Sequence, residues 1–290
     1  VGLILVGFAD NVMVSHHSLD ELAAASFVNN FLNLVIIFGM GFSYGLTPLV
    51  ATNKEWGRSD QVAHFLGHSF ILNLLIALVI GGGLLLLEGF LGAFNLSEEL
   101  RPLALPYYRI QIAGFMVVML FNTFKQYTEG MGDTQIPMYI TLAGNLINIG
   151  LNYLLIYGKG GFPEWGLYGA GIATLVSRVV MLVAIVTATA LLPRYRDILE
   201  RLRSLRLSWR EGMAPLLRLG TPVALQMGME AASFSVAVIL VARISTSALA
   251  AHQIIATIST LGFMVYYGIG AATAIRSSTL LAQGARHETR

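Results

Sequence analysis

Long runs of apolar residues, separated by short polar connections, dominate the chain. The runs are continuous and do not alternate at every second residue, so they predict membrane-spanning helices and not the strands of a β-barrel. A helix needs about 20 mostly apolar residues to cross about 30 Å of hydrocarbon. This criterion predicts eight spans, at residues 1–15, 22–50, 65–87, 103–124, 136–157, 167–192, 214–242 and 249–280.

Composition agrees with this pattern. Of the 290 residues, 56% are hydrophobic and 12% are charged, and the mean hydropathy is +0.69. Soluble domains average about 25% charged residues, so the composition excludes an ordinary soluble enzyme, a disordered chain and a coiled coil. We therefore expect an all-α polytopic membrane protein. Because these residues include no cysteine, disulfides and thiolate metal sites are excluded within them.

One connection differs from the others. Residues 194–210 carry six arginines, and Ile198, Leu202, Leu205 and Trp209 recur at helical spacing. A basic amphipathic segment between two spans is typical of a helix on the anionic cytoplasmic leaflet. If this segment is cytoplasmic, alternation of the spans places twelve Lys and Arg inside and four outside, as the positive-inside rule requires. The N-terminus is then cytoplasmic as well, and no nucleic-acid partner is expected.

The chain contains a weak internal repeat. A shift of 227 residues aligns Ser18 with Ser245, Leu22-Ala23-Ala24 with Leu249-Ala250-Ala251, and Gly41 with Gly268. The two copies lie six spans apart and share one orientation, which is the parallel repeat that some transporters use. We expect a first lobe at residues 1–193, a basic linker at 194–212 and the start of a second lobe at 213–290. The first span and the second repeat both look incomplete, so twelve spans are expected in the whole protein.

Ionisable and amide side chains within the spans are the candidate functional residues, because charges in the bilayer are costly. Asp10, Asn152 and Thr174 are predicted at one depth near the outer ends of their spans, and Asn148 lies one turn below Asn152. Carboxylate, amide and hydroxyl oxygens suit Na⁺ or a proton. The alternative for the two asparagines is hydrogen bonding between helices.

Several further residues have open interpretations. Glu230 lies near the centre of a span, one turn after Gln226, and could exchange a proton. It could also be an uncharged carboxyl bonded to another helix. His64 and His68 are spaced for a metal pair, but no third ligand is evident. Arg178 has no assigned role, and pairing with a carboxylate is one possibility. No catalytic cluster, nucleotide motif or cofactor site is present.

Several segments resemble the bacterial, NorM-like branch of the multidrug and toxin extrusion (MATE) family. They are GFADNVMV, LAAASFVNN, TPLVATNKEWGR, EGMGDTQIPM, NLINIGLNYLLIYG, GLYGAGIAT, GTPVALQMGMEAASF and ALAAHQI. The resemblance implies a two-lobed, twelve-helix antiporter of the bacterial inner membrane, which acts as a monomer and not as an enzyme. It would export organic cations and other drug-like compounds in exchange for Na⁺ or H⁺.

The resemblance also implies roles for individual residues. The cation site of the family's first lobe corresponds to Asp10, Asn148, Asn152 and Thr174, and its acidic residue in the seventh span corresponds to Glu230, with Gln226 beside it. Later helices that complete the family's second-lobe site are not in this sequence. A lipid-linked oligosaccharide flippase of the same architecture is the alternative function. It would favour a basic cavity, whereas the predicted spans contain only Arg178 and Arg276.

Overall fold

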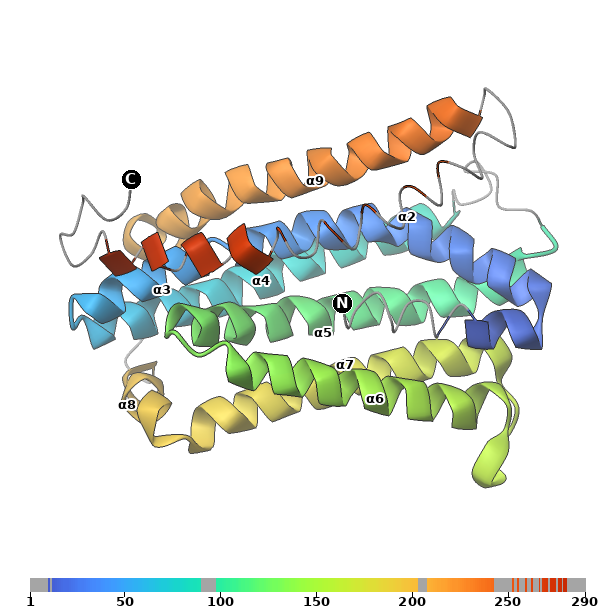
Figure 1. The fold of residues 1–290 in the computed structure, drawn as a ribbon, viewed down its shortest axis with the longest axis horizontal. Coiled ribbons are helices and arrows are strands. Elements are labelled where there is room, and N and C mark those ends of the chain that lie inside the picture. Colours follow the sequence, from blue (N-terminus) through green and yellow to red (C-terminus); the bar gives the residue numbers. More distant parts are fainter. Residues whose placement is uncertain are drawn as a thin grey trace.

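The computed structural model describes Asp10, residues 12–89, 98–202 and 208–242, and scattered positions between 252 and 280. Nearly all regular structure within these residues is helical, as expected for an all-α membrane protein. Long helices run side by side along the longest dimension of the molecule (Figure 1). The long elements are α2 (Leu19–Ser43), α3 (Leu46–Glu55), α4 (Ser59–Leu87), α5 (Arg101–Gly130), α6 (Gln135–Ile156), α7 (Gly166–Leu191) and α9 (Ala214–Ala242).

Shorter elements connect the long helices. They are the 3₁₀ turn η2 (Lys159–Gly161), the helix α8 (Pro193–Leu202) and the π-helical turn η3 (Trp209–Met213). Five of the described segments are long and apolar enough to cross a membrane: Leu19–Glu55, α4, α5, α6 and α7. These five segments and α9 coincide with six of the predicted spans. Of the first predicted span, at 1–15, only Asp10 and residues 12–15 are described. They are helical, as are the described positions of the eighth span.

The prediction of one continuous helix over residues 22–50 is wrong in one detail. The helix is interrupted between α2 and α3. There the backbone N–H groups of Tyr44 and Gly45 donate to the carbonyls of Gly41 and Phe42, three residues back, at 3.3 Å. Such tightening is common at helix ends. A Cβ atom at Gly45 would lie 2.7 Å from the backbone nitrogen of Gly220 in α9, so the break also lies at a close helix contact.

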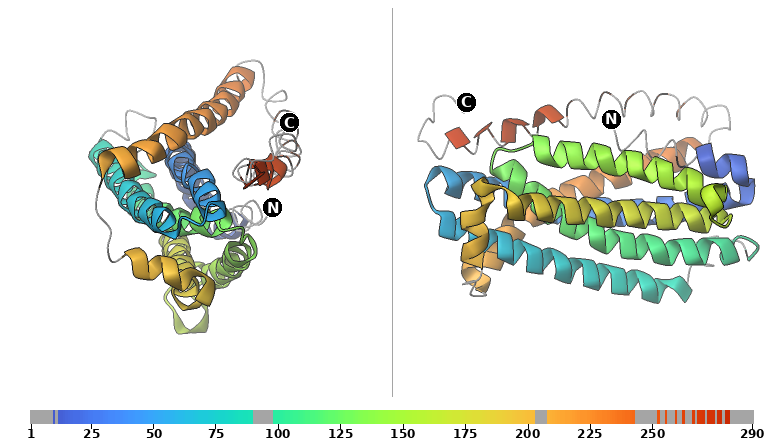
Figure 2. Two further views of the ribbon diagram at one scale, coloured as in Figure 1. Left: turned by 90° about the vertical axis from the view of Figure 1, so that its left-hand side faces the viewer. Right: turned by 90° about the horizontal axis from the view of Figure 1, so that it is seen from below.

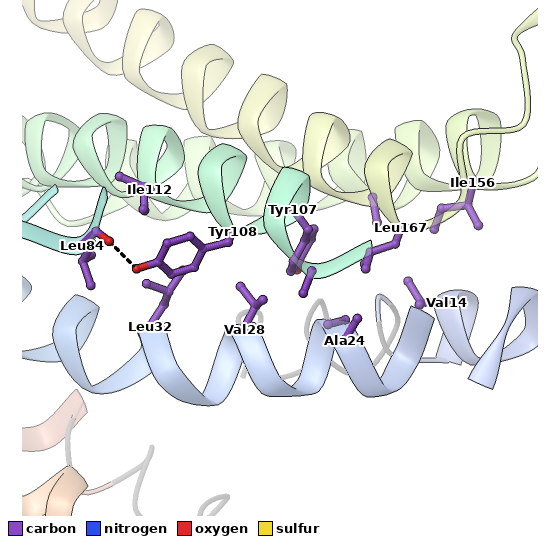
Figure 3. Packing of buried hydrophobic residues seen from close by; sticks show 13 residues of the cluster. Val14, Ala24, Val28, Leu32, Leu84, Tyr107, Tyr108, Ile112, Ile156 and Leu167 are labelled. Atoms are coloured by element: carbon purple, nitrogen blue, oxygen red, sulfur yellow. Dashed lines mark hydrogen bonds between the residues drawn. The ribbon is translucent and has the colours of Figure 1, made fainter. Parts of the chain in front are cut away.

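The main packing cluster joins α2, α4, α5 and α7. The Tyr108 ring of α5 is fully buried against Val28 and Leu32 of α2, and its hydroxyl donates to the Leu84 carbonyl of α4 at 2.7 Å (Figure 3). Lipid is as apolar as these side chains, so helix association in a bilayer depends on close packing and on such hydrogen bonds. The cluster holds the helices that position the candidate site.

Small residues bring α9 against α2. A Cβ atom at Gly41 would lie 2.4 Å from the Ala224 backbone, and one at Gly220 would lie 2.6 Å from the Phe42 carbonyl. Glycines at such crossings let two backbones approach closely. Two views place α9 on one side of α2, α4 and α5, with α6 and α7 on the other (Figures 1 and 2).

The helix α8 lies crosswise over one end of the bundle (Figures 1 and 2). Its Tyr195 and Ile198 side chains are buried against the cluster of α3, α4 and α5. The Tyr195 hydroxyl donates to Asp133 at 2.7 Å, and burial together with this carboxylate raises the pKa of Tyr195. The basic segment therefore begins as the predicted helix, but the described apolar side chains of α8 contact protein instead of lipid. Trp209, expected on the same stripe, lies in η3 and is 63% exposed.

Candidate functional site

Four predicted site residues form one chain of hydrogen bonds. The Asn152 amide Nδ2 donates to the Asp10 carboxylate and, at 3.3 Å, to the Asn148 carbonyl oxygen. The Asn148 amide donates to the Thr174 hydroxyl at 3.3 Å, and Thr174 donates to the Ala170 carbonyl at 3.0 Å. Residues separated by up to 164 positions thus meet between the first span, α6 and α7. The predicted common depth of Asp10, Asn152 and Thr174 agrees with this arrangement.

Burial leaves one acceptor of this cluster without a partner. The Asn148 and Asn152 side chains are 3% and 0% exposed, and Asp10 and Thr174 are partly buried. Asn152 Oδ1 has no hydrogen-bond partner among the described residues. A buried unsatisfied oxygen costs about 1–3 kcal/mol, so a cation or water molecule that reached Asn152 Oδ1 would remove this cost.

Local packing fixes the two helices that carry the amides and the hydroxyl. A Cβ atom at Gly144 of α6 would lie 2.3 Å from Met181 of α7, and one at Gly169 of α7 would lie 2.6 Å from the Leu155 carbonyl of α6. Asn148 and Asn152 share one face of α6 because they are four residues apart. The close contact between α6 and α7 directs this face toward Thr174.

A second chain of hydrogen bonds, which the sequence analysis did not predict, begins one helical turn from Thr174. Arg178 donates to the Gln111 carbonyl oxygen at 3.0 Å, Gln111 donates to the Tyr107 hydroxyl at 2.8 Å, and Tyr107 donates to Asn29 at 3.1 Å. Arg178 follows Thr174 by four residues and so shares its helix face. That spacing is the signal in the sequence that places Arg178 next to Thr174.

The structure does not bring Glu230 and Gln226 to this site. Both lie on α9, on the opposite side of α2 from α6 and α7 (Figure 2). Gln226 is exposed and Glu230 is partly exposed. Neither side chain makes a hydrogen bond to another described residue. Their predicted part in a second-lobe site stays a prediction.

The His64 and His68 pair has a structural use. The His68 Nδ1–H donates to the His64 carbonyl at 2.8 Å, and its Nε2 accepts the Ser208 backbone N–H at 2.9 Å. Both ring nitrogens of His68 are therefore hydrogen-bonded, and the bond to Ser208 holds the residue before η3 against α4. Within the described part of the chain, no three His, Cys, Asp or Glu side chains gather as a metal site would require.

Comparison with known proteins decides the family. The sequence model described as MatE matches residues 2–154 and 222–290. The chain belongs to the MatE family. Its members are transporters and not enzymes, and the predicted resemblance is confirmed.

Relatives of this MatE chain are multidrug resistance proteins. It is 31% identical over 278 residues to the multidrug resistance protein NorM of Vibrio vulnificus strain YJ016. This alignment covers 96% of the chain and 61% of the relative. It is 32% identical to the protein of the same name from Vibrio parahaemolyticus, which covers 93% of the chain and 59% of the relative. The chain thus spans about three fifths of the length of these relatives.

Solved structures share the fold. A MOP superfamily transporter from Pyrococcus furiosus superposes with a TM-score of 0.80 at 24% identity, over 97% of this chain and 61% of that one. The eukaryotic MATE transporter AtDTX14 superposes with a TM-score of 0.82 at 16% identity, over 98% and 62%. At these identities the similarity establishes the architecture of the MatE chain and nothing further.

Proposed function

We propose that this chain forms the first lobe and the start of the second lobe of a cation-coupled multidrug exporter. Its substrates would be organic cations and other drug-like compounds, moved by alternating access across a bacterial inner membrane, with the N-terminus in the cytoplasm. The family and the names of the NorM relatives support drug export. The observation that carries the coupling proposal is the chain of hydrogen bonds from Asp10 through Asn152 and Asn148 to Thr174.

Asp10 is the proposed carrier of the coupling ion. Its carboxylate accepts the Nδ2–H group of Asn152, and the Oδ1 atom of the same amide has no partner among the described residues. An asparagine amide can present either its N–H group or its oxygen to this position. In the ion-free state the N–H group bonds the carboxylate, and in the ion-bound state a turned amide would offer its oxygen instead.

Arg178 is proposed to balance the charge of Asp10 when no ion is bound. An isolated carboxylate within the bilayer is expensive, and a nearby cation lowers that cost. The same cation repels an incoming Na⁺ or proton, so the site would bind its ion reversibly instead of permanently. Ion binding can drive transport only if the ion binds the inward-open and outward-open states with different affinities.

Transport by the full-length protein in proteoliposomes tests the coupling role. Export of a fluorescent organic cation is measured with an imposed Na⁺ gradient, an imposed pH gradient, or neither. The Asp10→Asn variant should lose the acceleration by either gradient, whereas Asp20→Asn, the same change at an exposed position after Ser18, should retain it. Wild-type acceleration in Asp10→Asn would overturn the coupling role but leave the transporter family intact.

A further inference from the structure

A histidine just after the first span lies between two carboxylates. The His17 Nδ1 atom is 2.8 Å from Glu21 Oε2, and its Nε2 atom is 3.0 Å from Glu164 Oε1. Glu21 belongs to α2, and Glu164 belongs to the turn between η2 and α7. The start of α2 and this turn lie at the end of the bundle opposite α8 (Figure 1). We call the three side chains the His17 cluster.

Glu21 bonds to His17 because its usual local partner is already taken. Ser18 and Glu21 have the spacing of a capping box, in which the glutamate bonds to the backbone N–H of the capping serine. The Ser18 hydroxyl accepts the Glu21 N–H at 3.5 Å, but the Ser18 N–H donates to the Val14 carbonyl at 3.0 Å. The Glu21 side chain is 12% exposed and lies against α7, where a Cβ atom at Gly166 would overlap its carboxylate.

A compact turn presents Glu164 to the other side of the ring. Gly158 has a left-handed backbone with a φ of +62°, and a Cβ atom there would lie 2.9 Å from the Glu164 backbone nitrogen. The Trp165 N–H closes the turn by donating to the Leu155 carbonyl at 3.0 Å. The Glu164 side chain is 64% exposed, so its contact with His17 is the one that is more open to water.

The two contacts together require an extra proton. A neutral imidazole has a single N–H group, and an ionised carboxylate only accepts hydrogen bonds. Both contacts are hydrogen bonds only if the cluster holds one proton more than a neutral ring with two carboxylates. Without that proton, a lone pair of the ring faces a carboxylate oxygen and one contact becomes repulsive. Histidine exchanges its proton between about pH 5 and pH 8.

Other charges at this end of the bundle do not replace this proton. Within the described part of the chain, neither glutamate of the cluster pairs with a second basic side chain. Arg101, at the start of α5, pairs with Glu98 at 3.3 Å. The remaining titratable groups nearby are the exposed side chains of His16, Asp20 and Lys159.

We propose that the His17 cluster is a proton-dependent latch between the end of the first span and the turn at residues 158–165. With the proton bound, the ring joins Glu21 to Glu164 and holds the turn in place. Loss of the proton releases Glu164, because the contact with Glu21 is the more enclosed one. The Tyr157 hydroxyl donates to the Met13 carbonyl at 2.8 Å without an imidazole or a carboxylate, so the release is confined to the turn beyond Tyr157.

The latch would respond to the medium outside the cell if the N-terminus is cytoplasmic, as proposed above. Dipolar EPR spectroscopy of the full-length protein in nanodiscs tests it, with spin labels at Leu19→Cys and Phe162→Cys and no other cysteine. Both positions are exposed. Between about pH 5 and about pH 8, the distance between the labels should lengthen. The ratio of latched to released molecules should fall up to about fivefold, as expected for a partly exposed ion pair.

Variants of the cluster separate the latch from other titrating groups. His17→Gln should abolish the response to pH, whereas His16→Gln, the same change at the exposed neighbouring position, should retain it. Glu164→Gln should also abolish the response, because an amide can donate to or accept from a neutral ring and so stays in contact at both pH values. Asp10→Asn should retain the response, which tests the latch apart from the proposed cation site.

Three outcomes would overturn the proposal. The first is a label distance in the wild-type protein that does not change with pH. The second is a response that persists in His17→Gln or in Glu164→Gln. The third is a response that is lost in His16→Gln or in Asp10→Asn, because the titrating group would then lie outside the His17 cluster.

Discussion

Asp10 and Glu230 are both carboxyl groups in predicted spans, yet the structure gives them different surroundings. Asp10 accepts a hydrogen bond from a fully buried asparagine, which in turn bonds to Asn148. Glu230 lies on α9 without a described hydrogen-bond partner and is partly exposed. Depth in a span alone therefore does not separate the two acids. Among the described residues, they differ in the side chains that reach them from other helices.

The largest expected effect separates these two acids directly. In the full-length protein, Asp10→Asn should reduce gradient-driven export about 5- to 150-fold, the usual range of a coupling free energy. Glu230→Gln should raise the KM for a cationic substrate by about fivefold at most, because partly exposed charge pairs contribute about 1 kcal/mol or less. Both are measured by ethidium efflux at several substrate concentrations. A larger loss of coupling in Glu230→Gln would reverse the comparison.

Changing the contact of α9 with α2 should affect the stability of the protein and the position of α9, which carries Glu230, but not ion binding at Asp10. Gly220→Val places a side chain against the Phe42 carbonyl and should destabilise the protein by about 1–3 kcal/mol, the usual cost of overpacking. Gly82→Val, the same change where a Cβ atom meets nothing within 4 Å, is the matched control and should have a smaller effect. Thermal unfolding measures stability. Binding of the coupling ion, measured by calorimetry, should persist in folded Gly220→Val protein.

The Asn152 amide, which donates to Asp10, should also be essential to the proposed cation site. Asn152→Ala removes the donor to both Asp10 and Asn148, and the loss of these partners should cost about 1–3 kcal/mol. Ion-coupled export should fall with it. Asn148→Ala, which does not touch Asp10 directly, should reduce coupling less. Equal coupling losses in the two variants would mean that contact with Asp10 is not what matters.

The smallest expected effect concerns the charge balance. Arg178→Gln removes the cation near Asp10 and should increase the affinity for the coupling ion, because the ion is no longer repelled. Arg178→Lys keeps the charge and should retain the wild-type affinity. Half-maximal ion concentrations for export measure the change. A lower affinity in Arg178→Gln would show that the arginine organises the site through Gln111 instead.

The sequence predicted the helices and the Asp10 cluster because both follow from regular geometry. Counting residues from the ends of the spans placed Asp10, Asn152 and Thr174 at one depth, and the spacing of four placed Asn148 beneath Asn152. The chain through Gln111 and Tyr107 was missed because the pattern does not tell which face of α5 turns toward α7. The break at Tyr44 and Gly45 was missed because the apolar run continues through it.

The apolar side of residues 194–210 illustrates a further limit of pattern reading. A stripe of Ile198 and Leu202 looks the same whether it faces lipid or protein, since both are apolar surroundings. The three-dimensional packing is needed to show that Ile198 is buried against protein, in a cluster with Tyr127 and Val62. The difference between Asp10 and Glu230 has the same cause. Packing against neighbouring helices sets the rotation of a helix about its axis, and this rotation decides what an acidic side chain faces.

The attachment of the basic segment also determines how the start of α9 is held. Because α8 packs against α4 and the Ser208 N–H bonds to His68, both ends of residues 193–208 are anchored on α4. A Cβ atom at Gly212 of η3 would lie 2.2 Å from the His68 ring, so this turn is held against α4 as well. Any movement of α9 relative to α4 is therefore expected to begin after Gly212, although the polar stretch that precedes it is much longer.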